Sequence, residues 1–301
     1  MPLIQFTCSP FRLFICGAIF LAGIIGLNSA RGQSSESSPD TTLGTWTYDA
    51  TARLNASQAA YSNWQEGGGN NSLAFTTALD AEAVKRSDFW IQSYRTQLAF
   101  GLIDQESQEI RKAEDRTRLN TSLRYDGEGF FRLFNPTIAG RLRTQFASGF
   151  DYDEDPPVEN SAFFAPAFIT ESIGLTYEPR PSFMIRLGIA SKQTVVTEPA
   201  FRPLYDVDPD NTARVEAGAE LVSSYDKRLT ENIRYQSQLN VFFSINQTED
   251  PPDTRWENAI NLKVNDWLST DLTFEALFDR DITRAIQLKE TVSVGVSFTL
   301  L

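Results

Sequence analysis

From residue 46 onward, the chain repeats segments of about ten residues in which apolar and polar side chains alternate. In the first segment the apolar parity holds Trp46, Tyr48, Ala50, Ala52 and Leu54. A period of two predicts β-strands with one apolar and one polar face. The pattern predicts strands over 46–54, 73–83, 90–102, 119–125, 138–146, 169–177, 183–189, 215–225, 233–243, 256–264, 268–278 and 288–300.

The face opposite the apolar one carries too many charges for the core of a water-soluble sandwich, which is the alternative all-β fold. Each unpaired charge in a dry core would cost several kcal/mol. Water or a dense network of ion pairs must therefore fill the interior. The residues expected to line such a lumen are Arg95, Arg116, Arg118, Arg141, Arg143, Glu216, Glu220, Glu257, Asp271 and Glu275.

The predicted connections alternate between long and short. The long ones are 55–71, 103–116, 147–166, 191–213, 244–254 and 279–286, and the short ones include 85–88, 126–129, 179–181, 226–228 and 265–266. Such alternation is typical of a membrane barrel with both termini on the periplasmic side. The sequence therefore predicts an all-β fold, a single antiparallel up-and-down transmembrane β-barrel of about twelve strands, within a range of about ten to fourteen.

The first 32 residues have the form of a secretory signal peptide. An apolar run from Leu13 to Leu27 follows Arg12, and Ala30-Arg31-Gly32 offers small residues to a signal peptidase. We expect cleavage after Gly32, with Ala30 as the alternative. Residues 33–45 are polar and predict a disordered periplasmic leader, so the barrel would occupy 46–301 of a protein in the cell outer membrane.

Composition narrows the function classes. The chain has no His, and both cysteines, Cys8 and Cys16, lie in the signal peptide. Thiol and imidazole catalysis and Cys/His zinc sites are therefore excluded from the mature chain, and no cofactor is expected. Removal of Arg12 and Arg31 leaves 25 basic against 39 acidic residues, a net charge of −14, which excludes a nucleic-acid binder.

Clustered carboxylates in the predicted loops leave two alternatives beside a solvated acidic loop. They could bind Ca²⁺, which prefers oxygen ligands. Alternatively, an Asp/Asp pair from these loops, or a Ser/Lys pair, could catalyse hydrolysis. The acidic loop residues concerned are Asp151, Asp153, Glu154, Asp155, Asp206, Asp208 and Asp210. No catalytic or metal-binding residue is predicted from them, and the chain is expected not to be an enzyme.

The interior charges segregate by sign along the sequence. The third to fifth predicted strands are rich in arginine, whereas the eighth, tenth and eleventh are largely acidic. These groups could face each other across an open lumen and orient polar solutes, or pair directly and plug the barrel. Glu171 and Glu290 fall on the apolar parity, which indicates either an exposed position near a strand end or a local bulge.

A glycine-rich loop follows the first predicted strand and contains Asn63, Trp64, Gly67, Gly68 and Asn70. Because a strand follows it instead of a helix, the pattern does not indicate a phosphate-binding loop. The structural interpretation is a tight turn that needs positive φ angles at glycine and asparagine. A ligand-contacting loop is the functional alternative.

An ordered set of short motifs resembles the bacterial "domain of unknown function 3078" family. The set begins with Asn63-Trp64, Gly67-Gly68 and Asn70-Asn71-Ser72, and continues through Asp115-Arg116, Arg143-Thr144-Gln145-Phe146, Phe164-Ala165-Pro166-Ala167, Thr194-Val195-Val196, Glu216-Ala217-Gly218 and Leu288-Lys289-Glu290. The resemblance spans roughly residues 60 to 301 and departs at the three glycines of the first loop and the acidic stretch 151–159. It implies an exported protein of Bacteroidetes-type bacteria and supplies no catalytic residues.

Two functional hypotheses follow. The first is a narrow porin or transporter for small polar solutes or ions, and the second is a plugged barrel that acts as a structural or adhesion scaffold through its outer loops. A hydrolase using loop carboxylates is a weaker third. The expected partners are outer-membrane lipid, the solute itself and the barrel-assembly machinery, which would read the C-terminal strand that ends at Leu301.

Overall fold

In the computed structural model, the described residues are 43–59, 71–106, 108–246, 251–280 and 283–300. They belong to a single unit, Thr41–Leu301. The predicted signal peptide 1–32, most of the predicted leader 33–45 and the motif of Asn63, Trp64, Gly67, Gly68 and Asn70 lie outside them. Of the leader, residues 43–45 form a turn in which the Gly44 amide donates to the Arg86 carbonyl at 2.7 Å.

Twelve antiparallel strands close into a barrel, which confirms the predicted fold class and strand number. They are β1 (Trp46–Ala59), β2 (Ser72–Arg86), β3 (Trp90–Gln105), β4 (Arg111–Tyr125), β5 (Phe134–Thr144), β8 (Ala167–Arg180), β9 (Phe183–Val195), β10 (Ala213–Thr230), β11 (Ile233–Ser244), β12 (Asp253–Lys263), β13 (Leu268–Asp279) and β14 (Thr283–Thr299). Each pairs with its neighbours in sequence order, and β1 pairs with β14 to close the ring. Within the described part of the chain, no helix has the length and apolar character needed to cross a membrane.

The two faces of the barrel wall are inverted relative to a water-soluble protein. Large apolar side chains on the strands are exposed, as with Ile189 at 72% and Ile173 at 61%, whereas Glu220 is 2% and Glu216 3% exposed. A water-soluble fold would bury the apolar face instead. The apolar parity of each strand therefore faces outward, where it suits lipid, and the charged parity faces the interior.

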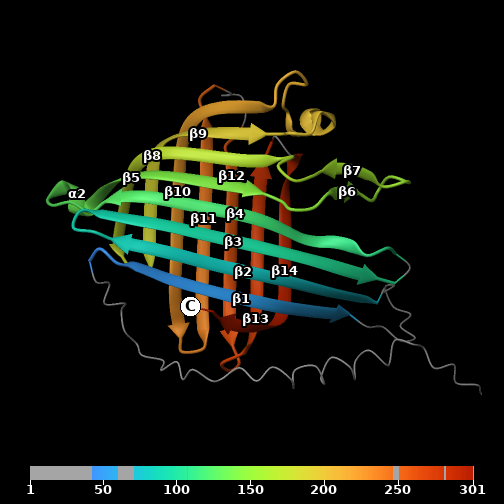
Figure 1. The fold of residues 1–301 in the computed structure, drawn as a ribbon, viewed down its shortest axis with the longest axis horizontal. Coiled ribbons are helices and arrows are strands. Elements are labelled where there is room, and N and C mark those ends of the chain that lie inside the picture. The colour runs from blue at the N-terminus through green and yellow to red at the C-terminus, as the bar shows by residue number, and fades with distance from the viewer. Residues whose placement is uncertain (1–42, 60–70, 107, 247–250, 281–282, 301) are drawn as a thin grey trace, which may run out of the picture. The chain divides into compact units, whose positions relative to one another are not determined.

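The strands are arranged as two crossing layers (Figure 1). The strands β1 to β5 run across the front of the view, and β10 to β14 run behind them in another direction.

Gly174 of β8 and Gly188 of β9 are register partners, and a Cβ at Gly174 would lie 2.2 Å from the Leu187 carbonyl oxygen. Glycine therefore permits a close approach of the two backbones that any side chain would prevent.

Most connections at one end of the barrel are short, but the alternation is not strict, because 126–133 at that end is longer than 106–110 and 280–282 at the other. One end, here called the turn end, carries 87–89, 126–133, 181–182, 231–232 and 264–267, and the other, the loop end, carries the remaining connections. The prediction of a long connection over 279–286 is wrong, because β14 begins at Thr283 and pairs with Asp279. The predicted connection 103–116 is also too long, since β3 reaches Gln105 and β4 begins at Arg111.

These errors share one physical cause. Apolar alternation marks the part of a strand that faces lipid, and it fades where the strand continues beyond the membrane into water. Residues 111–116 read Arg-Lys-Ala-Glu-Asp-Arg and nevertheless form paired strand. At the turn end, the predicted turn 126–129 extends to residue 133, because the short helix α2 (Phe130–Leu133) follows it.

Glu171 and Glu290, the two glutamates on the apolar parity, lie in regular strand. The register of β8 is continuous through Glu171, and that of β14 is continuous through Glu290. Both residues are exposed, and Gln193 donates to Glu171 at 3.4 Å. No bulge flips the parity there, so both glutamates face outward. Glu171 lies near the start of β8 as predicted, whereas Glu290 lies in the middle of β14, so the predicted position near a strand end is wrong for Glu290.

Aromatic side chains form a belt at the turn end. Trp90 contacts Tyr125 with ring centroids 5.2 Å apart, and Phe134 contacts Tyr177 at 5.4 Å. The helix α2 links these two pairs, because Phe131 contacts Tyr125 and Phe130 stacks on Phe134. Such a belt is typical of the level where a membrane meets water.

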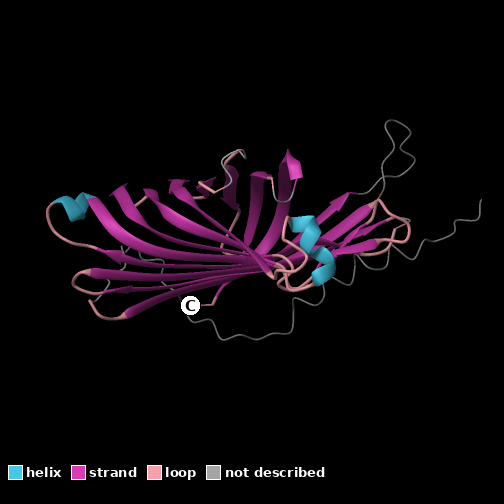
Figure 2. Cartoon of the chain, turned by 90° about the horizontal axis from the view of Figure 1, so that it is seen from above, coloured by secondary structure: helices cyan, strands magenta, loops and turns pink. Residues whose placement is uncertain are grey.

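The loop end carries a small apolar core of its own. Connection 145–166 contains a hairpin of β6 (Gly149–Asp151) and β7 (Val158–Ser161), and connection 196–212 contains the 3₁₀ helix η3 (Pro199–Tyr205). Ala165, Val196, Phe201 and Val207 are buried together between them. Figure 2 shows α2 and η3 at opposite ends of the strands.

Candidate functional site: the barrel interior

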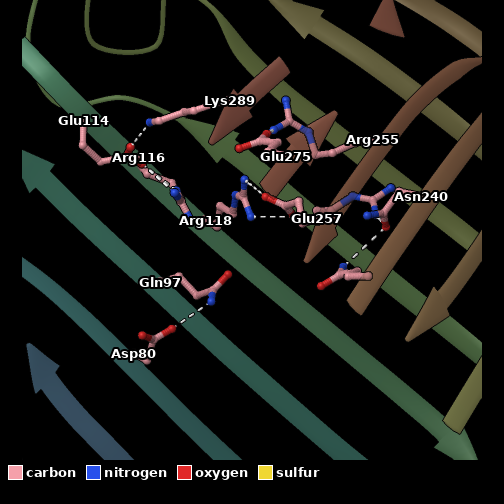
Figure 3. Close-up of polar contacts among 12 residues, drawn as sticks. Asp80, Gln97, Glu114, Arg116, Arg118, Asn240, Arg255, Glu257, Glu275 and Lys289 are labelled. Carbon is pink, nitrogen blue, oxygen red and sulfur yellow. Dashed lines mark hydrogen bonds and ion pairs between the residues drawn. The ribbon is translucent and has the colours of Figure 1, made fainter. Parts of the chain in front are cut away.

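A two-armed ion pair crosses the interior between β4 and β12. Arg118 donates through Nη2 to Glu257 Oε1 at 2.6 Å and through Nη1 to Oε2 at 2.9 Å (Figure 3). In the strand order, β4 and β12 lie opposite each other, since the path through β5, β8, β9, β10 and β11 is as long as that through β3, β2, β1, β14 and β13. The contact is therefore made through the lumen and not along the wall.

A second cluster surrounds Glu220 of β10. Its carboxylate pairs with Arg141 of β5 and lies 3.4 Å from Arg186 of β9. Arg141 also donates to Asn240 of β11. Glu220 is 2% exposed, so the two guanidiniums supply the compensation that a buried carboxylate requires.

A third cluster centres on Lys192 of β9. Its ammonium lies 2.5 Å from Asp253, 3.6 Å from Asp279 and 3.7 Å from Glu216. Glu216 also accepts from Arg214 at 2.9 Å. The cluster joins β9 and β10 to β12 and β13, so it too spans strands that are not neighbours in the wall.

Glu114 of β4 forms a fourth contact across the lumen. It accepts from Arg116 at 2.6 Å and pairs with Lys289 of β14 (Figure 3). Three strands of the barrel wall, β3, β2 and β1, lie between β4 and β14. Opposite-sign charges therefore meet at several heights within the interior.

The remaining predicted lumen residues contact neighbours in the wall. Glu275 of β13 pairs with Arg255 of the adjacent β12, and Asp271 accepts from Asn261 at 2.6 Å. Arg95 lies 3.6 Å from Glu82. The structure thus brings Arg118 to Glu257 and Arg141 to Glu220, and it leaves Arg95 and Asp271 apart from these clusters.

Arg143 differs from the other arginines on the interior face. Its guanidinium carbon lies 4.3 Å from the ring centroid of Phe168. Phe168 is an aromatic residue on the otherwise polar interior parity of β8, and it is the register partner of Arg143. Interior aromatics of this kind were not predicted, because apolar residues on the polar parity interrupt the alternation that identifies the strand.

Two cavities lie against Arg118. The central cavity has a volume of about 100 Å³, and its charged lining residues are Arg118, Arg141, Arg143, Lys192, Arg255, Asp253, Glu257 and Asp279. The loop-side cavity has a volume of about 220 Å³ and is lined by residues that include Glu114, Arg116, Arg143, Gln145 and Pro166. Arg118, Arg143, Phe168 and Arg255 line both.

The sequence pattern does not identify several interior residues. Glu114, Lys192, Asp253 and Asp279 fall in stretches that were assigned to loops, and Lys289 lies on the polar parity of β14. The available signal was the continuation of the polar parity beyond the apolar one, as in Arg214, Glu216, Gly218 and Glu220. Among the residues that the structure describes, no three acidic residues converge as metal ligands.

The fold of the loop end shifts the pKa of one titratable group, Tyr205 of η3, among the residues that the structure describes. Its hydroxyl donates to the Asn160 carbonyl at 3.2 Å. Burial raises the pKa of Tyr205 above its ordinary value of 10.0, and a hydrogen bond with Ser161 opposes the rise. This residue therefore reports on the packing of the connections and not on the lumen.

A closed antiparallel barrel with an apolar exterior and a charged interior defines a β-barrel membrane protein. Residues 56–150 match the family described as "Protein of unknown function (DUF3078)". This match confirms the resemblance that the sequence motifs indicated, although the motifs after residue 150 lie beyond the matched range. A search among curated proteins finds no relative of this sequence.

Among solved structures, similar chains include an outer membrane channel from Pseudomonas putida F1, with 10% identity and a TM-score of 0.39, over 88% of this chain and 99% of that one. The translocator domain of the autotransporter NalP from Neisseria meningitidis has 8% identity and a TM-score of 0.37, over 95% of each chain. The NanC porin has 10% identity and a TM-score of 0.36, over 84% of this chain and all of that one. Scores this low carry no argument about the function of this chain.

Proposed function

We propose that this chain is an outer-membrane channel for ions and small polar solutes, with its narrowest point at the ion pair of Arg118 and Glu257. The observation that carries the proposal is the contact of these two side chains between opposite strands, with cavities of about 100 and 220 Å³ beside it. The central cavity has space for about three waters. Space for water therefore lies beside the pair.

The ion pair at the narrowest point consists of two long side chains with rotatable bonds, which can act as a gate. Arg118 and Glu257 are 12% and 20% exposed, so water reaches both partners. A partly hydrated pair is worth less than a dry one, and its side chains can separate without a change of the backbone. The narrow, charged constriction favours small solutes and excludes large apolar ones.

Single-channel conductance in planar bilayers tests this function. We expect small channel events from the folded wild-type protein and larger conductance from the double variant Arg118→Ala/Glu257→Ala, which clears the constriction without leaving one charge unpaired. The control is Arg234→Ala/Asp226→Ala, which removes an exposed pair between the adjacent strands β10 and β11. Absence of events from both wild type and the cleared variant, with the barrel folded, would overturn the channel.

A plugged barrel that acts as a scaffold is the second candidate. The specific observation in its favour is the apolar core of Ala165, Val196, Phe201 and Val207, which gives connections 145–166 and 196–212 a fixed fold at the loop end. A fixed surface suits recognition better than a flexible one. If the cleared variant conducts no current but the barrel resists heat and protease, this second function replaces the first.

A further inference from the structure

Four arginines are grouped on the interior faces of β4 and β5. Arg118 and Arg143 are register partners, and Arg116 and Arg141 lie two residues away on their respective strands. Like charges directly opposite each other in a sheet are destabilising. Each of these cations therefore needs an anion within reach, and the lumen is where one can be placed.

Three of the four have a carboxylate. Arg116 is bonded to Glu114 at 2.6 Å, and Arg118 to Glu257 at the same distance. Arg141 is bonded to Glu220. The carboxylates of Glu257 and Glu220 come from β12 and β10, on the far side of the lumen.

Arg143 is the exception. Within the part of the chain that the structure describes, its guanidinium has no carboxylate and no hydrogen-bond partner, and it lies on the ring of Phe168 at 4.3 Å. The side chain is half-buried and lines both cavities. A ring face compensates a cation less than an oxyanion does, and it leaves all five N–H donors of the guanidinium unused.

The charge of the cavities has the sign that an anion requires. The central cavity is lined by five basic and three acidic residues, and the loop-side cavity by four basic and three acidic residues. Both are therefore net positive within a chain whose formal net charge is −12. The acidic surplus of the protein lies elsewhere, so attraction of anions is a local property of this part of the lumen.

We propose that Arg143, held against Phe168, binds the oxyanion group of a small solute, a carboxylate or a phosphate, within the lumen. The planar guanidinium matches two oxygens of such a group, and its stacking on the ring fixes the plane before the solute arrives. The inference deepens the proposed channel by naming its solute class and rests on it for transport. Binding itself requires no conduction.

Isothermal titration of the detergent-folded protein with inorganic phosphate measures the site directly. We expect wild type to bind phosphate, Arg143→Gln to lose affinity about tenfold or more, and Arg143→Lys to lose part of it because a point charge replaces the fork. Arg180→Gln, which removes the same charge from the exposed end of β8, should bind as wild type does. Heat-modifiable gel mobility checks that each variant is folded.

Two results would overturn the site: no phosphate binding by wild type, or equal affinity in wild type and Arg143→Gln. Because Arg143→Lys keeps the charge, it tests the site even if the glutamine variant fails to fold. If the Arg143→Lys variant bound phosphate as tightly as wild type does, the forked geometry would be wrong.

Reversal potentials in a KCl gradient separate this inference from the proposed channel. Wild type should prefer anions, and Arg143→Gln should shift the potential toward cation preference. Phosphate binding without any channel events would refute the channel and leave the site standing in a closed barrel. Channel events without Arg143-dependent phosphate binding would refute the site and leave the channel standing.

Discussion

Arg118 of β4 and Glu257 of β12 form a two-armed ion pair across the barrel interior, at 2.6 and 2.9 Å. Their strands lie opposite each other in the ring, so the pair ties together parts of the wall that share no backbone hydrogen bond. The two residues are 139 positions apart in the sequence. A contact of this kind couples lumen closure to the stability of the barrel.

Glu257→Gln should therefore destabilise the folded barrel by less than the roughly 3 kcal/mol expected for a dry pair, because it leaves Arg118 without its anion but within reach of water. The charge swap Arg118→Glu/Glu257→Arg should recover most of this loss, since it restores the pair with its direction reversed. Urea unfolding in lipid vesicles measures both. A swap that is as unstable as the single variant would show that the pair contributes little through its charges.

The alternation of apolar and polar residues was sufficient to predict the barrel. Residues such as Val292, Val294 and Val296 mark the outward parity of β14 directly, and their neighbours must then face the interior. The same logic places Arg118 and Glu257 on the interior parity. The existence and face of each strand could therefore be predicted, because lipid imposes a strict period of two.

The pairing of the interior charges could not be predicted in the same way. Whether Arg141 meets Glu220 or another acid depends on strand tilt and on the stagger around the ring, which no single strand encodes. Lys192 and Asp253 were assigned to loops, because the apolar parity ends before the strand does. Arg143 was placed on the interior face, but its lack of a carboxylate becomes visible only when every neighbour is in position.

Glu220→Gln should be among the most destabilising conservative changes in the interior. The carboxylate lies between Arg141 and Arg186 and is 2% exposed. Its removal leaves two guanidiniums facing each other with no anion between them, at a cost of about 3 kcal/mol in the free energy of unfolding. Urea unfolding in vesicles measures the loss.

The control for Glu220→Gln is Asp266→Asn, at a carboxylate that is 97% exposed and pairs with Lys263. A hydrogen bond and the charge of Lys263 lower the pKa of Asp266, yet a fully hydrated pair contributes little to stability. We expect the control to unfold as wild type does. Equal effects of the two substitutions would show that Glu220 is hydrated and not buried.

Ile189→Lys should lower the stability of the barrel in lipid by about 2–4 kcal/mol, because the side chain would face hydrocarbon. Ile189 is 72% exposed on the outer face of β9. The matched control is Ile110→Lys, in the connection between β3 and β4, where the side chain is 63% exposed. Folding into vesicles followed by urea unfolding compares the two.

The interpretation that the outer face of β9 contacts lipid depends on the difference in stability loss between these two substitutions. Both are exposed to a similar extent, so a water-soluble protein would tolerate lysine equally at either position. A similar, small loss of stability in both lysine variants would place the exterior of β9 in water and contradict the membrane barrel.

Tyr205 should report the unfolding of the loop end at high pH. Burial raises its pKa above 10.0 in the folded protein, so the folded state favours the neutral phenol. The stabilisation is fully present below the ordinary pKa of tyrosine and is lost as the pH rises from 10 through the raised value. Absorbance at the wavelength of ionised tyrosine, compared between wild type and Tyr205→Phe, should reveal one phenol in wild type that titrates above pH 10.

Protease sensitivity of connections 145–166 and 196–212 should rise over the same pH range, because the ionised hydroxyl can no longer donate to the Asn160 carbonyl. Tyr205→Phe should remove the pH dependence and leave the apolar core of Ala165, Val196, Phe201 and Val207 in place. If the phenol titrates at 10 or below, it is hydrated, and the loop end does not pack around it. Because the lumen pairs do not involve Tyr205, channel conductance should be the same in wild type and Tyr205→Phe, which separates the stability of the loop end from the state of the constriction.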